Sequence, residues 1–213
     1  MGSVVHKSHE HNHSSAACHM RLACEESTIH NPQSTIPDGI STLDHLMEHL
    51  AEVLTPRTAV VCIGNELCGD DAAGPVIAKR LAGKVPWDVH DAQTVPESFL
   101  MKIVERRPDT VLLIDALDFG AAPGAIELFD ASRLGGQGPS THGPAPLAFL
   151  EVLKMFLPCR QVVLGIQPAA GGFGNEMCGP VRTAVDLVVE ALTTLSPPWA
   201  RPTDSPAPGA EER

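Results

Sequence analysis

Short apolar runs that alternate with segments of helical periodicity constrain the fold of this chain more than any other feature. The runs at 59–63 and 110–114 are continuous and end in turns, which is typical of buried parallel strands. The expected strands cover 59–63, 85–89, 110–114, 125–129 and 161–166, and the expected helices cover 44–54, 74–81, 97–106, 146–156 and 180–195. This alternation predicts an α/β domain with a mostly parallel sheet.

The chain is expected to have three parts. Residues 1–57 form a histidine-rich and largely disordered extension, residues 58–195 form the folded domain, and residues 196–213 form a proline-rich flexible tail. Five histidines lie close together near its start, namely His6, His9, His11, His13 and His19. They could bind metal or belong to an incidental polar tail, and composition leaves both interpretations open.

Composition excludes several classes of protein. The formal net charge of -11 argues against nucleic-acid binding, and no apolar stretch is long enough to predict a membrane span. None of the six cysteines forms a Cys-x-x-Cys pair, so we expect reduced thiols. Because the start of the chain also lacks the layout of a secretory signal, a cytoplasmic location is expected.

Three chemically active side chains lie at or just beyond expected strand ends, where ligands of parallel sheets bind. Asp71 follows the strand at 59–63, Asp115 comes directly after four apolar residues, and His142 lies near a glycine-rich loop at 135–139. A buried carboxylate needs a partner or a cation, although Asp115 alone could be structural. A lone loop histidine is most often a surface residue. Together, two carboxylates and one imidazole suit a divalent ion such as nickel or zinc, with positions left open for water or substrate.

Other chemistries fit the sequence less well. Cys62 stands where a dinucleotide-binding turn would need its first glycine, and no Gly-Lys-Ser or Gly-Lys-Thr phosphate loop is present. The chain has no Gly-x-Ser-x-Gly motif, and Cys68 is the only loop thiol that could act as a nucleophile beside His142. Asp70 fits helix capping or loop bracing.

The order of motifs resembles one known family. The motifs are Gly64-Asn65 with Gly69-Asp70-Asp71, Val95-Pro96-Glu97, Arg107-Pro108-Asp109, Ile114-Asp115-Ala116 with Pro123-Gly124, Thr141-His142, and Gly165-Ile166-Gln167-Pro168. From about residue 59 to 195 the chain resembles the nickel-iron hydrogenase maturation endopeptidases, and its details are most similar to the branch that processes hydrogenase 3.

The resemblance implies a three-layer α/β/α fold and an endopeptidase, of aspartic type, that removes the C-terminal peptide of a nickel-iron hydrogenase large-subunit precursor after nickel insertion. It implies that Asp71, Asp115 and His142 are the metal-contacting and catalytic residues, that the substrate carries the nickel, and that another divalent metal could occupy the isolated protein. The alternative from another class is a nickel-binding chaperone or scaffold that delivers metal through the N-terminal histidines without cutting.

Overall fold

A computed structural model describes residues 40, 42–131, 145–169 and 172–196 of the chain, without the side chains of 145–147. The chain divides into two units, Met1–His30 and Asn31–Arg213, and every described residue belongs to the second. The expectations for residues 1–39, for the glycine-rich loop at 135–139 and for the tail beyond Ser196 therefore lie outside the described residues. His142 lies outside them as well.

The elements of the described part follow the expected alternation of strands and helices. In chain order they are α1 (Leu43–Val53), β1 (Thr58–Ile63), the 3-10 helix η1 (Gly69–Ala72), α2 (Ala73–Leu81), β2 (Asp88–Gln93), the 3-10 helix η2 (Pro96–Phe99), α3 (Leu100–Arg106), β3 (Thr110–Ala116), β4 (Ile126–Asp130), α4 (Ala145–Phe156), β5 (Arg160–Ile166) and α5 (Gly179–Leu195). None of the helices in these described ranges is long and apolar enough to span a membrane.

Two elements differ from the sequence expectation by more than a residue or two at their ends. The second strand begins at Asp88 rather than 85, because Pro86 cannot donate to a strand ladder, although Val85 and Trp87 are still buried. The helix expected at 97–106 begins as a 3-10 turn with Pro96 in its first position and becomes α-helical only at Leu100.

The five strands form one sheet in the order β2-β1-β3-β5-β4. Strands β2, β1, β3 and β5 pair in parallel, whereas the edge strand β4 is antiparallel to β5. From β1 the chain first moves outward to β2 and then returns to β3 on the other side of β1. The order of the strands therefore reverses between β1 and β3, and sheets of this kind bind their ligands at such a point, beyond the carboxyl ends of the strands.

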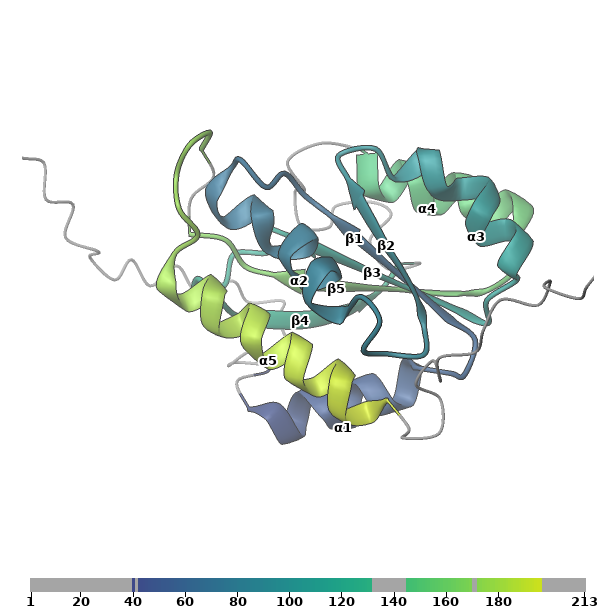
Figure 1. Cartoon of the computed structure of the whole chain (residues 1–213), viewed down its shortest axis with the longest axis horizontal. Helices are drawn as coiled ribbons and strands as arrows, with labels where there is room; N and C mark the ends of the chain where they lie inside the picture. Colours follow the sequence, from purple (N-terminus) through teal and green to yellow (C-terminus); the bar gives the residue numbers. More distant parts are fainter. Residues whose placement is uncertain (1–39, 41, 132–144, 170–171, 197–213) are drawn as a thin grey trace, which may run out of the picture. The chain divides into compact units, whose positions relative to one another are not determined.

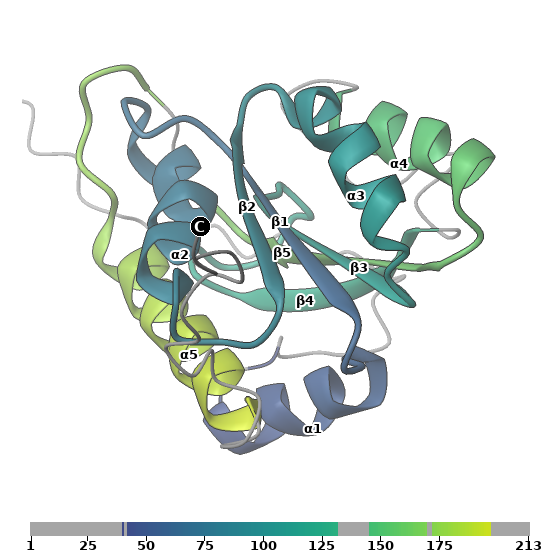
Figure 2. The same cartoon turned by 45° about the vertical axis from the view of Figure 1, so that its right-hand side comes forward.

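Helices cover both faces of the sheet, which confirms the three-layer α/β/α arrangement. Figures 1 and 2 show α1, α2 and α5 on one face and α3 with α4 on the other. The strands alternate accordingly: Leu112 and Ile114 belong to the core under α1, α2 and α5, whereas Leu113 belongs to the core under α3 and α4. This alternation places the side chain of Asp115 on the α3/α4 face, at the end of β3.

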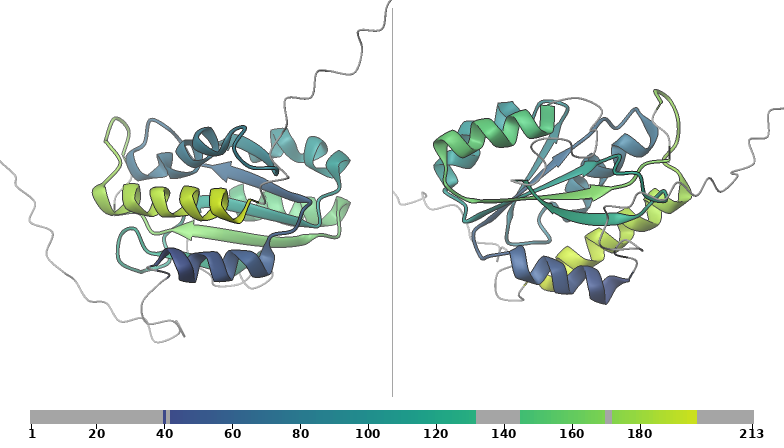
Figure 3. Two further views of the ribbon diagram at one scale, coloured as in Figure 1. Left: turned by 60° about the horizontal axis from the view of Figure 1, so that its bottom comes forward. Right: turned by 180° about the vertical axis from the view of Figure 1, so that it is seen from behind.

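The packed core begins before residue 58. Leu46 and Leu50 of α1 are fully buried against the same core as α5, and Figure 3 shows these two helices side by side. Thr42 caps the helix by accepting a hydrogen bond from the backbone N–H of His45. Ile40 pairs with Ile126 at the start of β4. The amphipathic helix expected at 44–54 is thus present and forms part of the domain.

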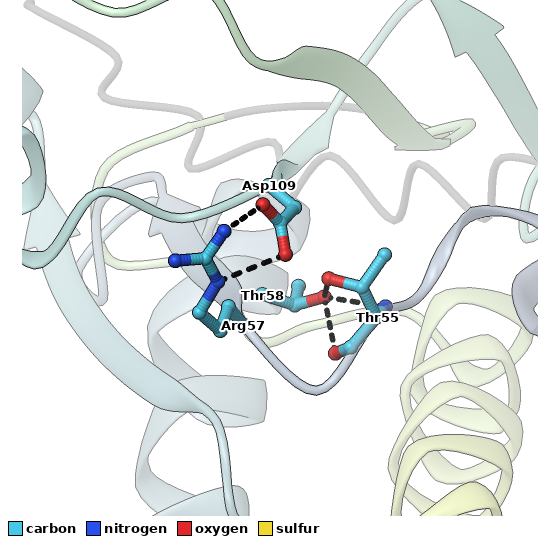
Figure 4. A network of polar contacts seen from close by, with 4 residues as sticks. All are labelled: Thr55, Arg57, Thr58 and Asp109. Atoms are coloured by element: carbon cyan, nitrogen blue, oxygen red, sulfur yellow. Dashed lines mark hydrogen bonds and ion pairs between the residues drawn. The ribbon is translucent and has the colours of Figure 1, made fainter.

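Ion pairing and short turns hold the amino ends of β1 and β3 together, at the edge opposite the carboxyl ends of the strands. Figure 4 shows the guanidinium of Arg57 binding the carboxylate of Asp109 through two nitrogens. Beside it, the Thr55 N–H donates to Thr58 Oγ1, and Thr58 Oγ1 donates to the Thr55 carbonyl, each at 2.9 Å. Asp109 is therefore a paired surface carboxylate, in contrast to Asp115 at the other end of the same strand.

Candidate active site

Two glycines let the turn after β1 pack directly against the end of that strand. Gly64 has φ +139°, and a Cβ at this position would lie 1.9 Å from the backbone oxygen of Asp71. A Cβ on Gly74 would lie 2.0 Å from the backbone oxygen of Ile63. Only glycine permits these two approaches, which return the chain so that Asp71 lies beside the end of β1.

Asn65 gives this turn its shape. Its side-chain Oδ1 accepts the Leu67 N–H at 3.0 Å, and its carbonyl accepts the Cys68 N–H at 3.0 Å. Its own N–H donates to the carbonyl of Asp71 at 3.1 Å, and the Asp71 N–H donates to the carbonyl of Cys68 at 3.1 Å. An Asx turn therefore leads into η1 and fixes the backbone on both sides of Asp71.

The structure brings Asp71 and Asp115 together. Asp115 is 6% exposed, and its register with Gly165 places it one residue beyond the Cys62–Ile114 pair of β1 and β3. Burial, followed by the negative charge of Asp71, raises the pKa of Asp115 to about 7, and a hydrogen bond from the Ala116 backbone opposes this change. A carboxyl group with this pKa changes its protonation state near neutral pH, as a general acid or base must.

The donor set of this pair suits a divalent cation. Two neighbouring carboxylates, one of them buried, repel each other when both are ionised, and a bound cation removes that repulsion. The described residues contain no group of three or more histidine, cysteine, aspartate or glutamate side chains arranged to hold a metal ion. Asp71 and Asp115 can thus supply two of the three expected ligands, and the position of His142 is not described.

Asp70 performs the bracing role that the sequence left open. It is 1% exposed, and its two carboxylate oxygens accept backbone N–H groups from Ala169, at 2.8 Å, and Cys178, at 2.7 Å. These bonds join η1 to the segment that leads from β5 to α5. Burial and the nearby Asp70 carboxylate also raise the pKa of the Cys178 thiol, which argues against a reactive thiolate there.

Gln167 organises the loop after β3, a role that the sequence did not reveal. Its Oε1 accepts the N–H groups of Phe119, at 2.9 Å, and Ala121, at 3.2 Å, and its Nε2 donates to Asp118 at 3.1 Å. Its backbone also pairs with Gly124 and Ala125. The available signal was a polar residue directly after the buried strand β5, the same pattern that singled out Asp115.

Apolar side chains are exposed near the carboxylates and were not expected from the sequence. Leu67 is 59% exposed in the turn that carries Asp71, and Phe173 is 79% exposed between β5 and α5. The Gly174 N–H donates to the Leu67 carbonyl at 2.7 Å, so these two segments touch. The thiols of Cys62, Cys68, Cys159 and Cys178 are all free.

Known proteins are similar to this chain in sequence and in fold. The family profile described as hydrogenase maturation protease matches residues 76–195. The hydrogenase 3 maturation protease of Escherichia coli (strain K12) is 36% identical over 136 residues, which cover 62% of this chain and 86% of that protein. Its name agrees with the branch that the motifs indicated.

Solved structures give the same result. The NiFe hydrogenase maturation protease HycI from Thermococcus kodakarensis KOD1 has a TM-score of 0.63 at 27% identity and covers 70% of this chain and 96% of its own. The solution structure of the endopeptidase HycI from Escherichia coli has a TM-score of 0.59 at 33% identity, with coverages of 64% and 89%. The chain therefore belongs to the hydrogenase maturation protease family and is a peptidase.

Proposed function

We propose that this peptidase removes the C-terminal peptide of a nickel-iron hydrogenase large-subunit precursor after nickel has been inserted. The family and its named relatives support this substrate. The observation that carries the proposal is the convergence of Asp71 and Asp115 at the carboxyl ends of β1 and β3, where a sheet of this order binds its ligands.

In this proposal the substrate's nickel is the recognition element. Asp71, Asp115 and His142 would contact the ion through two carboxylates and an imidazole, a donor set that suits a borderline divalent metal. Contact with the ion would hold the scissile peptide bond near the carboxylates. A precursor without nickel would bind, but its scissile bond would not be placed next to them. The same donors could take up zinc or another divalent ion in the isolated protein.

The carboxylates would carry the proton transfers of peptide hydrolysis. A water molecule attacks the carbonyl carbon of the scissile bond, the C–N bond breaks, and the proton lost by the water reaches the leaving amine. One of the two carboxylates, Asp115 in this proposal, would accept this proton from the water and return it to the amine. Asp71, which follows the glycine-fixed turn, would orient the ion or the water.

The net charge of -11 supports a protein substrate rather than nucleic acid or a membrane surface. The free thiols of the described cysteines support a reaction in the cytoplasm. The partner is then the folded precursor, whose C-terminal segment must reach Asp71 and Asp115.

The test uses purified precursor with and without nickel. Mass spectrometry of the released peptide should show cleavage of the nickel-loaded form only. Asp71→Asn, Asp115→Asn and His142→Ala should each fold and leave the precursor intact. Asp109→Asn is the matched control, since this aspartate lies at the other end of β3 and pairs with Arg57; it should cut at the wild-type rate.

Equal cleavage of nickel-free precursor would refute recognition through the metal. Full processing by one of the three variants would remove that residue from the mechanism while leaving the peptidase activity in place.

A further inference from the structure

Asp70 is fully buried and cannot touch a protein substrate, yet both of its oxygens are used to hold one surface segment. The Ala169 and Cys178 N–H groups that it accepts lie on either side of the described residues 172–177, which include exposed Phe173. A third bond, from the Gly174 N–H to the Leu67 carbonyl at 2.7 Å, fastens the same segment to the turn after β1. Three hydrogen bonds thus join two segments that are far apart in the sequence.

Apolar side chains are exposed both on the turn that carries Asp71 and on the segment fastened to it. Leu67 and Phe173 remain 59% and 79% exposed although the carbonyl of Leu67 is hydrogen-bonded to the N–H of Gly174, the residue after Phe173. Large apolar side chains that are held out from a rigid backbone commonly anchor a partner, because little conformational entropy is lost when they bind. Leu67 adjoins the site, since it lies in the hydrogen-bonded turn that ends at Asp71.

We propose that Asp70 is a positioning residue for the reaction. It holds Leu67 and Phe173 in place, so that both side chains contact the polypeptide of the precursor next to the scissile bond. This inference rests on the proposed function and extends it to the choice of substrate. The bound group is a peptide segment with an apolar side chain, because the exposed side chains of Leu67 and Phe173 are aliphatic and aromatic. The adjacent carboxylates are assigned to the nickel ion of the substrate.

Kinetics separate this role from a purely structural one. Phe173→Ser and Leu67→Ser should each raise the precursor concentration needed for half-maximal cleavage at least fivefold, with the maximal rate within a factor of two. Met155→Ser is the matched control, because Met155 is 80% exposed at the end of α4, next to the amino end of β5. It should leave both parameters unchanged.

Asp70→Asn should raise the half-maximal concentration by a similar factor, because an amide can no longer accept both N–H groups. The double variant Asp70→Asn/Phe173→Ser should be no worse than Asp70→Asn alone, since the aspartate acts through the segment that carries the phenylalanine. If the two effects multiply instead, Asp70 does not act through Phe173 and the inference fails. If Asp70→Asn does not fold, the two surface variants still decide whether the apolar pair contacts the substrate.

Binding gives a second readout that does not require cleavage. In the Asp115→Asn background, precursor should bind at least fivefold more weakly when Phe173→Ser is added. Unchanged binding alongside normal wild-type cleavage would overturn this inference and leave the proposed function standing. Wild-type protein that never cuts loaded precursor would overturn the proposed function, whereas the binding comparison would still report on the apolar pair.

Discussion

The carboxylate of Asp71 lies close enough to that of Asp115 to raise its pKa, although one follows β1 and the other ends β3. Burial and a like charge act in the same direction on Asp115. The fold therefore keeps an acidic pair at a cost to its own stability, which is typical of a site that is arranged for chemistry.

Asp115→Asn should stabilise the protein, and more so at pH 8 than at pH 5. The folded-state pKa of about 7 is above the ordinary value of 3.8, so the stability that Asp115 contributes is present below pH 3.8 and is lost as pH rises through about 7. The full loss corresponds to roughly 4 kcal/mol, which an amide avoids. Thermal melting at both pH values checks this. Asp109→Asn, with its exposed ion pair, should show no such gain.

Gly64→Ala should disrupt the site, whereas Gly83→Ala should not. Both glycines have positive φ, but a Cβ on Gly64 would lie 1.9 Å from the Asp71 backbone oxygen and one on Gly83 would meet nothing within 4 Å. We expect a loss of about 3 kcal/mol or more at Gly64 and about 1 kcal/mol at Gly83. Urea unfolding gives the two values. Equal losses would show that backbone conformation alone, rather than contact with Asp71, accounts for the glycine at 64.

Sequence periodicity predicted the layered fold because the buried strands are apolar along their whole length. The runs of β1, β3 and β5 bury nearly every side chain, so their pattern differs clearly from that of the amphipathic helices. The edge strand β2 has the sequence Asp-Val-His-Asp-Ala-Gln. Because four of these residues are polar, periodicity did not predict its boundaries correctly. The preceding apolar residues Val85 and Trp87 pack into the core without joining the sheet.

The carboxylates of the site were predictable, but their supports were not. Asp115 was visible as a charge directly after a buried run, and Asp71 as an acid beyond a strand end. The partners of Asp70 and Gln167 are backbone N–H groups from distant segments, and a backbone group has no sequence signature. The exposure of Leu67 and Phe173 likewise depends on tertiary packing, and the identity of one residue in a loop does not predict whether its side chain is buried.

Gln167→Ala should loosen the loop after β3. Its side-chain oxygen accepts two N–H groups, from Phe119 and Ala121, and both would lose their acceptor. Such loss costs roughly 2–3 kcal/mol, compared with about 1 kcal/mol for Gln161→Ala, whose side chain donates to the Leu150 carbonyl. Hydrogen exchange should accelerate at residues 119 and 121 in the first variant only. Unchanged protection there would mean that the loop is held by other contacts.

His90 should make the fold sensitive to acid. Its ring is 1% exposed, and burial lowers its pKa below the ordinary 6.5, aided by Lys102 and Arg106 and opposed by Asp88. A lowered histidine pKa means that stability is complete above pH 6.5 and falls as the pH drops below it. His90→Phe should flatten this fall. Measuring both proteins in the Asp115→Asn background removes the opposite contribution of that carboxyl group, and parallel curves would contradict the assignment to His90.

Two N-terminal deletions should separate a dispensable extension from part of the core. Removing residues 1–39 leaves Ile40 and α1 in place, so the protein should melt as the full chain does. Removing residues 1–57 also takes away buried Leu46, Leu50 and Val53, and exposes the face of α5 that they cover. At typical values for buried side chains this costs of the order of 5 kcal/mol or more, enough to unfold the domain.

The shorter deletion also decides between cutting and metal delivery. A peptidase whose carboxylates lie beyond β1 and β3 should still trim nickel-loaded precursor without residues 1–39, at a rate within a factor of two of the full chain. A carrier that works through His6, His9, His11, His13 and His19 would instead lose its activity with them. The two readouts, melting temperature and released peptide, are measured on the same sample, so a loss of cleavage with an unchanged melting curve would assign a functional role to the extension itself.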